Sequence, residues 1–179
     1  MAAAGDAVAS IPRNPVLTRK ADMSKIEHNL RQLGIELPIP LAPVANYLPY
    51  VQSGNLIHIS GQICAGADGT IADAHRGKVG GAVTKEAGQE AATLCLINVL
   101  AQLKLAVDGD FSRVVRCVRL GGFINSTPNF SALPAVMNGA SDLIVAVMGD
   151  AGRHARSTVG VAQLPLDCAV EVEAVFEVQ

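Results

Sequence analysis

The end of the chain alternates between apolar and acidic side chains, and this alternation constrains the fold more than any other feature of the sequence. Apolar residues take every second position from Val170 to Val178, and Glu171, Glu173 and Glu177 stand between them. Successive side chains of a β-strand point to opposite faces, so the segment predicts a strand with one buried and one acidic face. Any partner that covers the outer face of the sheet must therefore accommodate these three carboxylates.

The rest of the chain divides into helical and extended segments. Ser24 and Glu27 form a capping box, and apolar residues recur at helical spacing after Thr84 and from Leu133 onward. We predict helices over residues 24–33, 84–106 and 133–147, and strands over 50–52, 55–60, 114–124, 157–162 and 169–178, with a tight turn at Ser53-Gly54 and a bulge at Gly121-Gly122. This order predicts an α+β fold, in which a single mixed sheet carries two main helices on one face.

Proline and glycine mark the connections between these segments. Three prolines lie within residues 36–43, which favours an extended linker rather than a helix. We expect a mobile segment over residues 1–21, a helix with a proline-rich linker over 22–42, and a main domain over 43–179. Residues 65–81 are rich in glycine and have no periodicity, so they predict a surface loop.

The chain carries few charges for its size. Charged residues make up 17% of its 179 residues, against about a quarter in an average soluble domain. The shortage suggests that self-association hides part of the surface, and the open face of the sheet is the natural place for it. A net charge of −2 and an aromatic content of 3% argue against nucleic acid as the main partner.

The sequence also indicates where the protein resides and what it lacks. The four cysteines lie apart in apolar stretches, which predicts buried free thiols in a reducing compartment. No secretory signal and no apolar run of about 18 residues occurs, so we expect a cytoplasmic protein without a membrane span. The four histidines have no metal-ligand spacing, and we predict no metal site.

Two charged residues near the C-terminus are the candidates for chemistry. Arg156 stands at the start of one predicted strand and Glu171 near the start of the next. A hairpin or neighbouring pairing of these strands would bring the guanidinium and the carboxylate together. An ordinary salt bridge at a sheet edge explains the same pattern, so the pair alone does not establish a catalytic site.

Three stretches together resemble a known family. YVQSGNLIHISGQ (residues 50–62), Asn138, and HARSTVGVAQLPLDCAVEVEA (residues 154–174) are similar to the Rid family of reactive-intermediate deaminases. This family is also called YjgF, or endoribonuclease L-PSP, and the resemblance covers residues 43–178. It implies a chorismate-mutase-like fold, assembled as a homotrimer with three clefts between subunits. The N-terminal helix resembles a longer branch of the family.

The resemblance also implies an activity and a set of site residues. The activity is hydrolysis of reactive enamines and imines, such as 2-aminoacrylate, to 2-oxo acids and ammonia without a cofactor. By resemblance, the substrate-binding arginine is Arg156, the acid that positions water is Glu171, and the residues lining the cleft are Tyr50, Ser60, Gly61 and Asn138. The ligand would be a small 2-imino or 2-oxo acid.

One position departs from the family pattern. Thr158, which the resemblance also places among the substrate-binding residues, stands where many members carry a cysteine after the Arg-Ser pair. Threonine cannot supply a thiolate, but imine hydrolysis requires only backbone amides there, so we expect the activity to survive. Two other functions stay open: a non-catalytic trimer that binds small carboxylates through Arg156, and an endoribonuclease or translation inhibitor, against which the composition argues.

Overall fold

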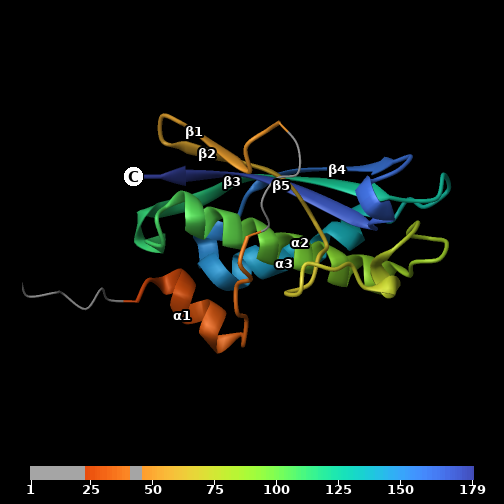
Figure 1. The fold of residues 1–179 in the computed structure, drawn as a ribbon, viewed down its shortest axis with the longest axis horizontal. Helices are drawn as coiled ribbons and strands as arrows, with labels where there is room; N and C mark the ends of the chain where they lie inside the picture. The colour runs from red at the N-terminus through yellow and green to blue at the C-terminus, as the bar shows by residue number, and fades with distance from the viewer. Residues whose placement is uncertain (1–22, 41–45) are drawn as a thin grey trace, which may run out of the picture.

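The computed structural model describes residues 23–40 and 46–179, in which a five-stranded sheet with strand order β1-β2-β5-β3-β4 forms one layer (Figure 1). The strands are β1 Tyr50–Ser53, β2 Leu56–Ile63, β3 Val114–Asn125, β4 Ala155–Val161 and β5 Val170–Val178. Only β3 and β4 run parallel, so the sheet is mixed, as predicted. The predicted mobile segment, residues 22 and 41–42 of the predicted helix and linker, and residues 43–45 of the predicted main domain lie outside the described residues.

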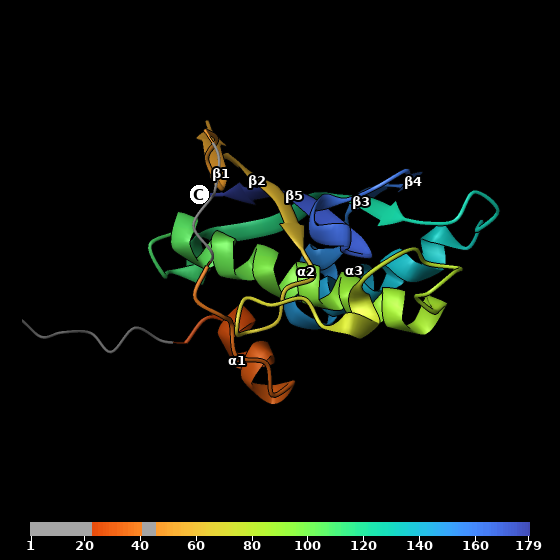
Figure 2. The ribbon, with the colours of Figure 1, turned by 45° about the vertical axis from the view of Figure 1, so that its right-hand side comes forward.

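Within the described ranges, the α-helices that accompany the sheet are α1 Lys25–Gln32, α2 Lys85–Ala106 and α3 Leu133–Met148. Figures 1 and 2 show α2 and α3 side by side against one face of the sheet, while no helix of the described chain covers the opposite face. The predicted caps are present: the Ser24 hydroxyl accepts from the Glu27 backbone, and the Thr84 hydroxyl accepts from the Ala87 backbone. The α+β prediction, with both main helices on one face, is confirmed.

Strand β5 separates the core from the open face, as its alternation predicts. Val170, Val172, Ala174, Phe176 and Val178 are buried, and they form one core cluster with the inner faces of α2 and α3. The glutamates between them lie on the other face and are half-buried. All four cysteines are buried and free, so their predicted burial as free thiols is confirmed.

The predicted turn and bulge are displaced. The β1–β2 turn is Gly54-Asn55, and Gly54 has a φ of 59°, as the first central position of a type II′ turn requires. The bulges of β3 precede Gly121-Gly122, which stay in register. Glycine at position 121 instead makes room for a neighbouring side chain, because a Cβ there would overlap Glu173 on the adjacent strand.

The segment 65–81 and helix α1 both pack more closely against the rest of the protein than the sequence suggests. Residues 65–81 form an irregular segment, but Ile71, His75 and Val79 are buried, so the prediction of a plain surface loop is wrong. Helix α1 packs on α3, and the side-chain amide of Asn29 donates to the Val147 carbonyl at 2.7 Å. The division into an N-terminal part and a main domain stays a prediction. Among the residues described, no helix is both long and apolar enough to span a membrane.

Candidate functional site

Arg156 lies on the edge strand β4, and α3 anchors its guanidinium. Nη1 donates to Oδ1 of Asn138 at 2.9 Å and to Oγ of Ser141 at 3.0 Å, which uses both of its protons. Within residues 23–40 and 46–179, nothing hydrogen-bonds to Nε or Nη2. The side chain is exposed. One edge of the guanidinium is thus fixed to the protein, and the other is free for a planar anion.

A serine and a histidine that sequence reasoning missed extend this network. Ser141 Oγ lies 3.1 Å from Nε2 of His154, whose Nδ1 lies 2.7 Å from the Gly152 carbonyl oxygen. The spacing of Ser141 and His154 from the predicted site residues could have identified both. Ser141 follows Asn138 by three residues on a helix, and His154 precedes Arg156 by two at a strand, so each pair shares a face.

Glu171 lies on the open face of the sheet, beside a bulge in β2. The β2–β5 register shifts between Ile59 and Gln62, and Gly61 within this bulge lies against the Glu171 carboxylate. A Cβ at Gly61 would overlap Oε1 of Glu171, so only glycine allows this approach. The structure therefore brings Gly61 and Glu171 together and gives the glycine a steric reason.

The surroundings of Glu171 disfavour its charge. Burial raises the pKa of the Glu171 carboxyl, and the neighbouring charge of Glu173 raises it further. Glu173 itself is paired with Arg119, whose Nη1 lies 2.7 Å from Oε1. In the part of the chain that the structure describes, no donor reaches the Glu171 carboxylate. Its oxygens remain available to a water molecule or a substrate.

The raised pKa predicts a stability effect of Glu171→Gln. A carboxyl with a raised folded-state pKa contributes stability below its unfolded pKa, and this contribution is lost as the pH rises through the folded pKa. We therefore expect E171Q to unfold at a higher urea concentration than the wild type near pH 7, with the difference vanishing once the wild-type carboxyl is protonated. Glu177→Gln is the matched control, because Asn55 hydrogen-bonds Glu177 at 3.1 Å. Equal gains in both variants would contradict the prediction.

Of the other predicted site residues, Tyr50 and Ser60 lie together where β1 pairs with β2, and Thr158 lies on β4. Tyr50 pairs with Ile59 and packs against the core. The hydroxyl of Ser60 donates to the Leu48 carbonyl at 2.7 Å, so its proton is already engaged. Thr158 is two residues beyond Arg156, and its buried Oγ1 has no partner among the described residues.

The expected proximity of Arg156 and Glu171 within one chain is wrong. Strand β3 separates β4 from β5, and the register places Arg156 opposite Leu120 but Glu171 opposite Phe123. The two residues are thus about 10 Å apart across the sheet and about 10 Å apart along it. They also lie on opposite faces, because Leu120 is buried beneath the helices whereas Glu171 belongs to the open face. The two cannot act on one small substrate within a single copy of the chain.

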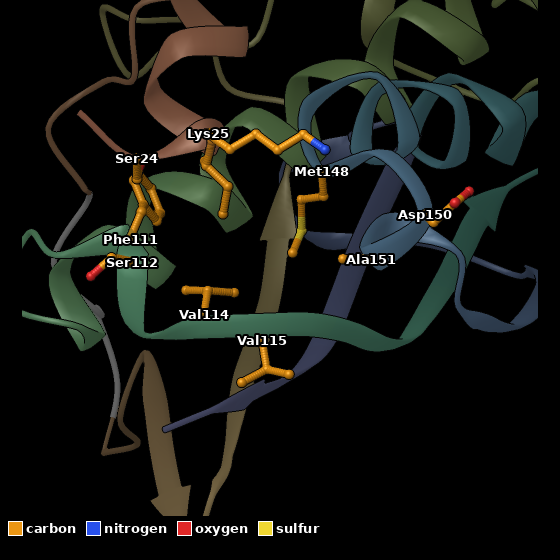
Figure 3. A pocket seen from close by; sticks show the side chains of 10 residues that line it. Ser24, Lys25, Phe111, Ser112, Val114, Val115, Met148, Asp150 and Ala151 are labelled. Carbon is orange, nitrogen blue, oxygen red and sulfur yellow. The ribbon is translucent and has the colours of Figure 1, made fainter. Parts of the chain in front are cut away.

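A hollow of about 380 Å³ elsewhere on the molecule contains none of the predicted site residues. Figure 3 shows it between α1, the start of β3 and the end of α3, with Lys25 reaching across toward Met148. Its lining is mainly apolar and includes Phe111, Val114 and Val115. Among the residues described, no three His, Cys, Asp or Glu side chains gather as a metal site.

The comparison with known proteins decides the family. Residues 27–177 match the family described as "YjgF/chorismate mutase-like, putative endoribonuclease". The chain belongs to the YjgF family. The fold is accordingly the chorismate-mutase-like YjgF fold, as the sequence motifs imply.

Relatives within the YjgF family carry several names. The chain is 46% identical over 154 residues to Protein TCP17 of Trypanosoma cruzi, a match that covers 86% of this chain and 94% of the relative. It is 28% identical over 145 residues to a 2-iminobutanoate/2-iminopropanoate deaminase of Dermatophagoides farinae, covering 81% and 95%. The crystal structure of Atu1372 from Agrobacterium tumefaciens, a protein of unknown function, is similar with a TM-score of 0.80 at 44% identity, covering 87% and 93%.

Proposed function

We propose that this YjgF family protein is a homotrimeric deaminase that hydrolyses 2-imino acids and their enamines, such as 2-aminoacrylate, to 2-oxo acids and ammonia. The observation that carries the proposal is the free Nε/Nη2 edge of Arg156, held outward by the bonds from Nη1 to Asn138 and Ser141. Such an edge forms two parallel charge-assisted hydrogen bonds to a carboxylate. The deaminase relative from D. farinae supports this substrate class.

Glu171 supplies the second half of the chemistry. Its half-buried carboxylate has a raised pKa and, among the described residues, no donor, so it can orient a water molecule and accept its proton. The water oxygen bonds to the imine carbon, and the C=N π electrons move to nitrogen, which takes up a proton. Glu171 then returns its proton to the amino nitrogen of this adduct and accepts the proton of the new hydroxyl. The C=O bond forms as the C–N bond breaks, which releases ammonia and leaves the 2-oxo acid.

The opposite orientations of Arg156 and Glu171 require a second copy of the chain. Arg156 is exposed on an edge strand, and Glu171 faces outward from the uncovered sheet face, so each can border a cleft with a neighbouring subunit. The low content of charged residues fits an open face that is buried by association. In this arrangement Arg156 of one subunit binds the carboxylate, and Glu171 of the next activates the water.

Two measurements test the proposal. The wild-type protein should accelerate pyruvate and ammonia formation from 2-aminoacrylate released by a pyridoxal-phosphate dehydratase. Arg156→Ala and Glu171→Gln should each lose most of the activity alone, but hybrids from equal co-expression should recover about one quarter of the sites, because one subunit then supplies the arginine and its neighbour the glutamate.

The outcomes separate the alternatives. Absence of acceleration by the wild type, combined with saturable binding of 2-oxobutanoate, would replace the deaminase with a carboxylate-binding protein. Inactive hybrids, with wild-type activity intact, would exclude a site shared between subunits.

A further inference from the structure

A chain of hydrogen bonds anchors Arg156. It runs through Ser141 and His154 to the backbone carbonyl of Gly152. We propose that Ser141 and His154 are positioning residues, which hold the Arg156 guanidinium so that its free edge accepts a single planar carboxylate. This inference rests on the proposed function and concerns how the same site recognises its substrate. Neither residue contacts the reacting atoms, so they act through Arg156.

The proton positions in this chain follow from its end. The Gly152 oxygen can only accept, so Nδ1 of His154 carries the proton of that 2.7 Å bond. In the neutral imidazole, Nε2 is then an acceptor, and the Ser141 hydroxyl donates to it at 3.1 Å. The remaining lone pairs of Ser141 are left for Nη1 of Arg156. With His154 in the neutral form, each group thus has one role, and the hydrogen bonds run in one direction from Arg156 to the Gly152 carbonyl.

The backbone end of the chain is rigid. Gly152 is buried, and a Cβ there would overlap the carbonyl oxygen of Ile144 on α3, so this turn packs directly against the helix. Ser141 and Asn138 project from the same helix. His154 therefore connects the turn to α3, and α3 holds the guanidinium at two points. Without this chain, a long exposed arginine side chain would sample several rotamers.

The free donors of Arg156 also indicate which class of imine the proposed site would prefer. Nη1 is fully occupied by Asn138 and Ser141, which leaves three donors on Nε and Nη2. Two of these lie parallel and match one carboxylate. We expect the protein to favour imines that carry a carboxylate on the adjacent carbon over imines of simple aldehydes, and to depend on Ser141 and His154 for this preference.

The test is a double-mutant cycle with ligand binding as the readout. We expect Ser141→Ala to weaken binding of 2-oxobutanoate, measured by calorimetry, and to raise KM for 2-imino acids about tenfold, with little change in kcat. In the Arg156→Ala background the same substitution should have no further effect. His154→Ala should behave as S141A does, whereas Ser141→Thr and His154→Gln, which retain the hydroxyl and an acceptor, should restore part of the affinity.

Asp142→Ala is the control, since Asp142 is exposed and next to Ser141 on α3. Wild-type affinity in S141A, or an equal loss in the Arg156→Ala background, would overturn the positioning role while leaving the deaminase proposal intact. A wild-type protein that neither binds 2-oxo acids nor hydrolyses imines would instead refute the proposed function itself.

Discussion

Replacement of Arg156 by alanine is expected to lower kcat/KM for 2-imino acids by about 30-fold or more, because loss of one partner from a hydrogen-bonded charge pair costs about 2–5 kcal/mol. Arg156→Lys should recover little of this loss. Lysine presents a point charge and cannot bind Asn138 and Ser141 at one end while offering two parallel donors at the other.

Steady-state kinetics with enzymatically generated 2-aminoacrylate measure this effect. Arg153→Ala is the matched control, because Arg153 lies three residues earlier and its exposed side chain pairs with the exposed Asp150 at 3.2 Å. The control should retain its rate, and all variants should melt near the wild-type temperature. Wild-type turnover in R156A would remove the carboxylate anchor from the mechanism.

Local signals made most of the fold predictable. The alternation in β5, the capping box at Ser24 and the Thr84 cap each depend on residues within a few positions of one another. Periodicity and caps are properties of single elements, so they can be read without knowing how the elements pack. The strands and helices consequently appear where the sequence places them, within a few residues.

The site was less predictable because it depends on strand order. Strands β4 and β5 follow one another in the chain, which suggests a hairpin, yet β3 lies between them and pairs with β4 in parallel. The sequence near Arg156 and Glu171 contains no signal that β3 lies between their two strands. The β2 bulge at Gly61 was also missed, because the side chain that Gly61 contacts there, Glu171, belongs to a strand more than 100 residues away.

Replacement of Glu171 by glutamine is expected to lower kcat for 2-imino acids by about 100-fold or more, because removal of a general base typically costs about two to four orders of magnitude. The amide keeps the size of the side chain, so the binding of 2-oxobutanoate through Arg156 should stay near the wild-type value. A loss in kcat with an unchanged ligand affinity separates a catalytic carboxylate from a binding one.

Substitution of Gly61 is a second way to test the Glu171 carboxylate. Gly61→Ala places a methyl group where Oε1 of Glu171 lies, so it should displace the carboxylate without removing it and should also lower kcat. Glu177→Gln alters another glutamate of β5 that Asn55 already hydrogen-bonds, and it should leave kcat unchanged. If E171Q turns over at the wild-type rate, water activation must come from another group. If G61A and E171Q both lose kcat while 2-oxo acid affinity stays constant, the bulge in β2 is what holds the Glu171 carboxylate in its catalytic position.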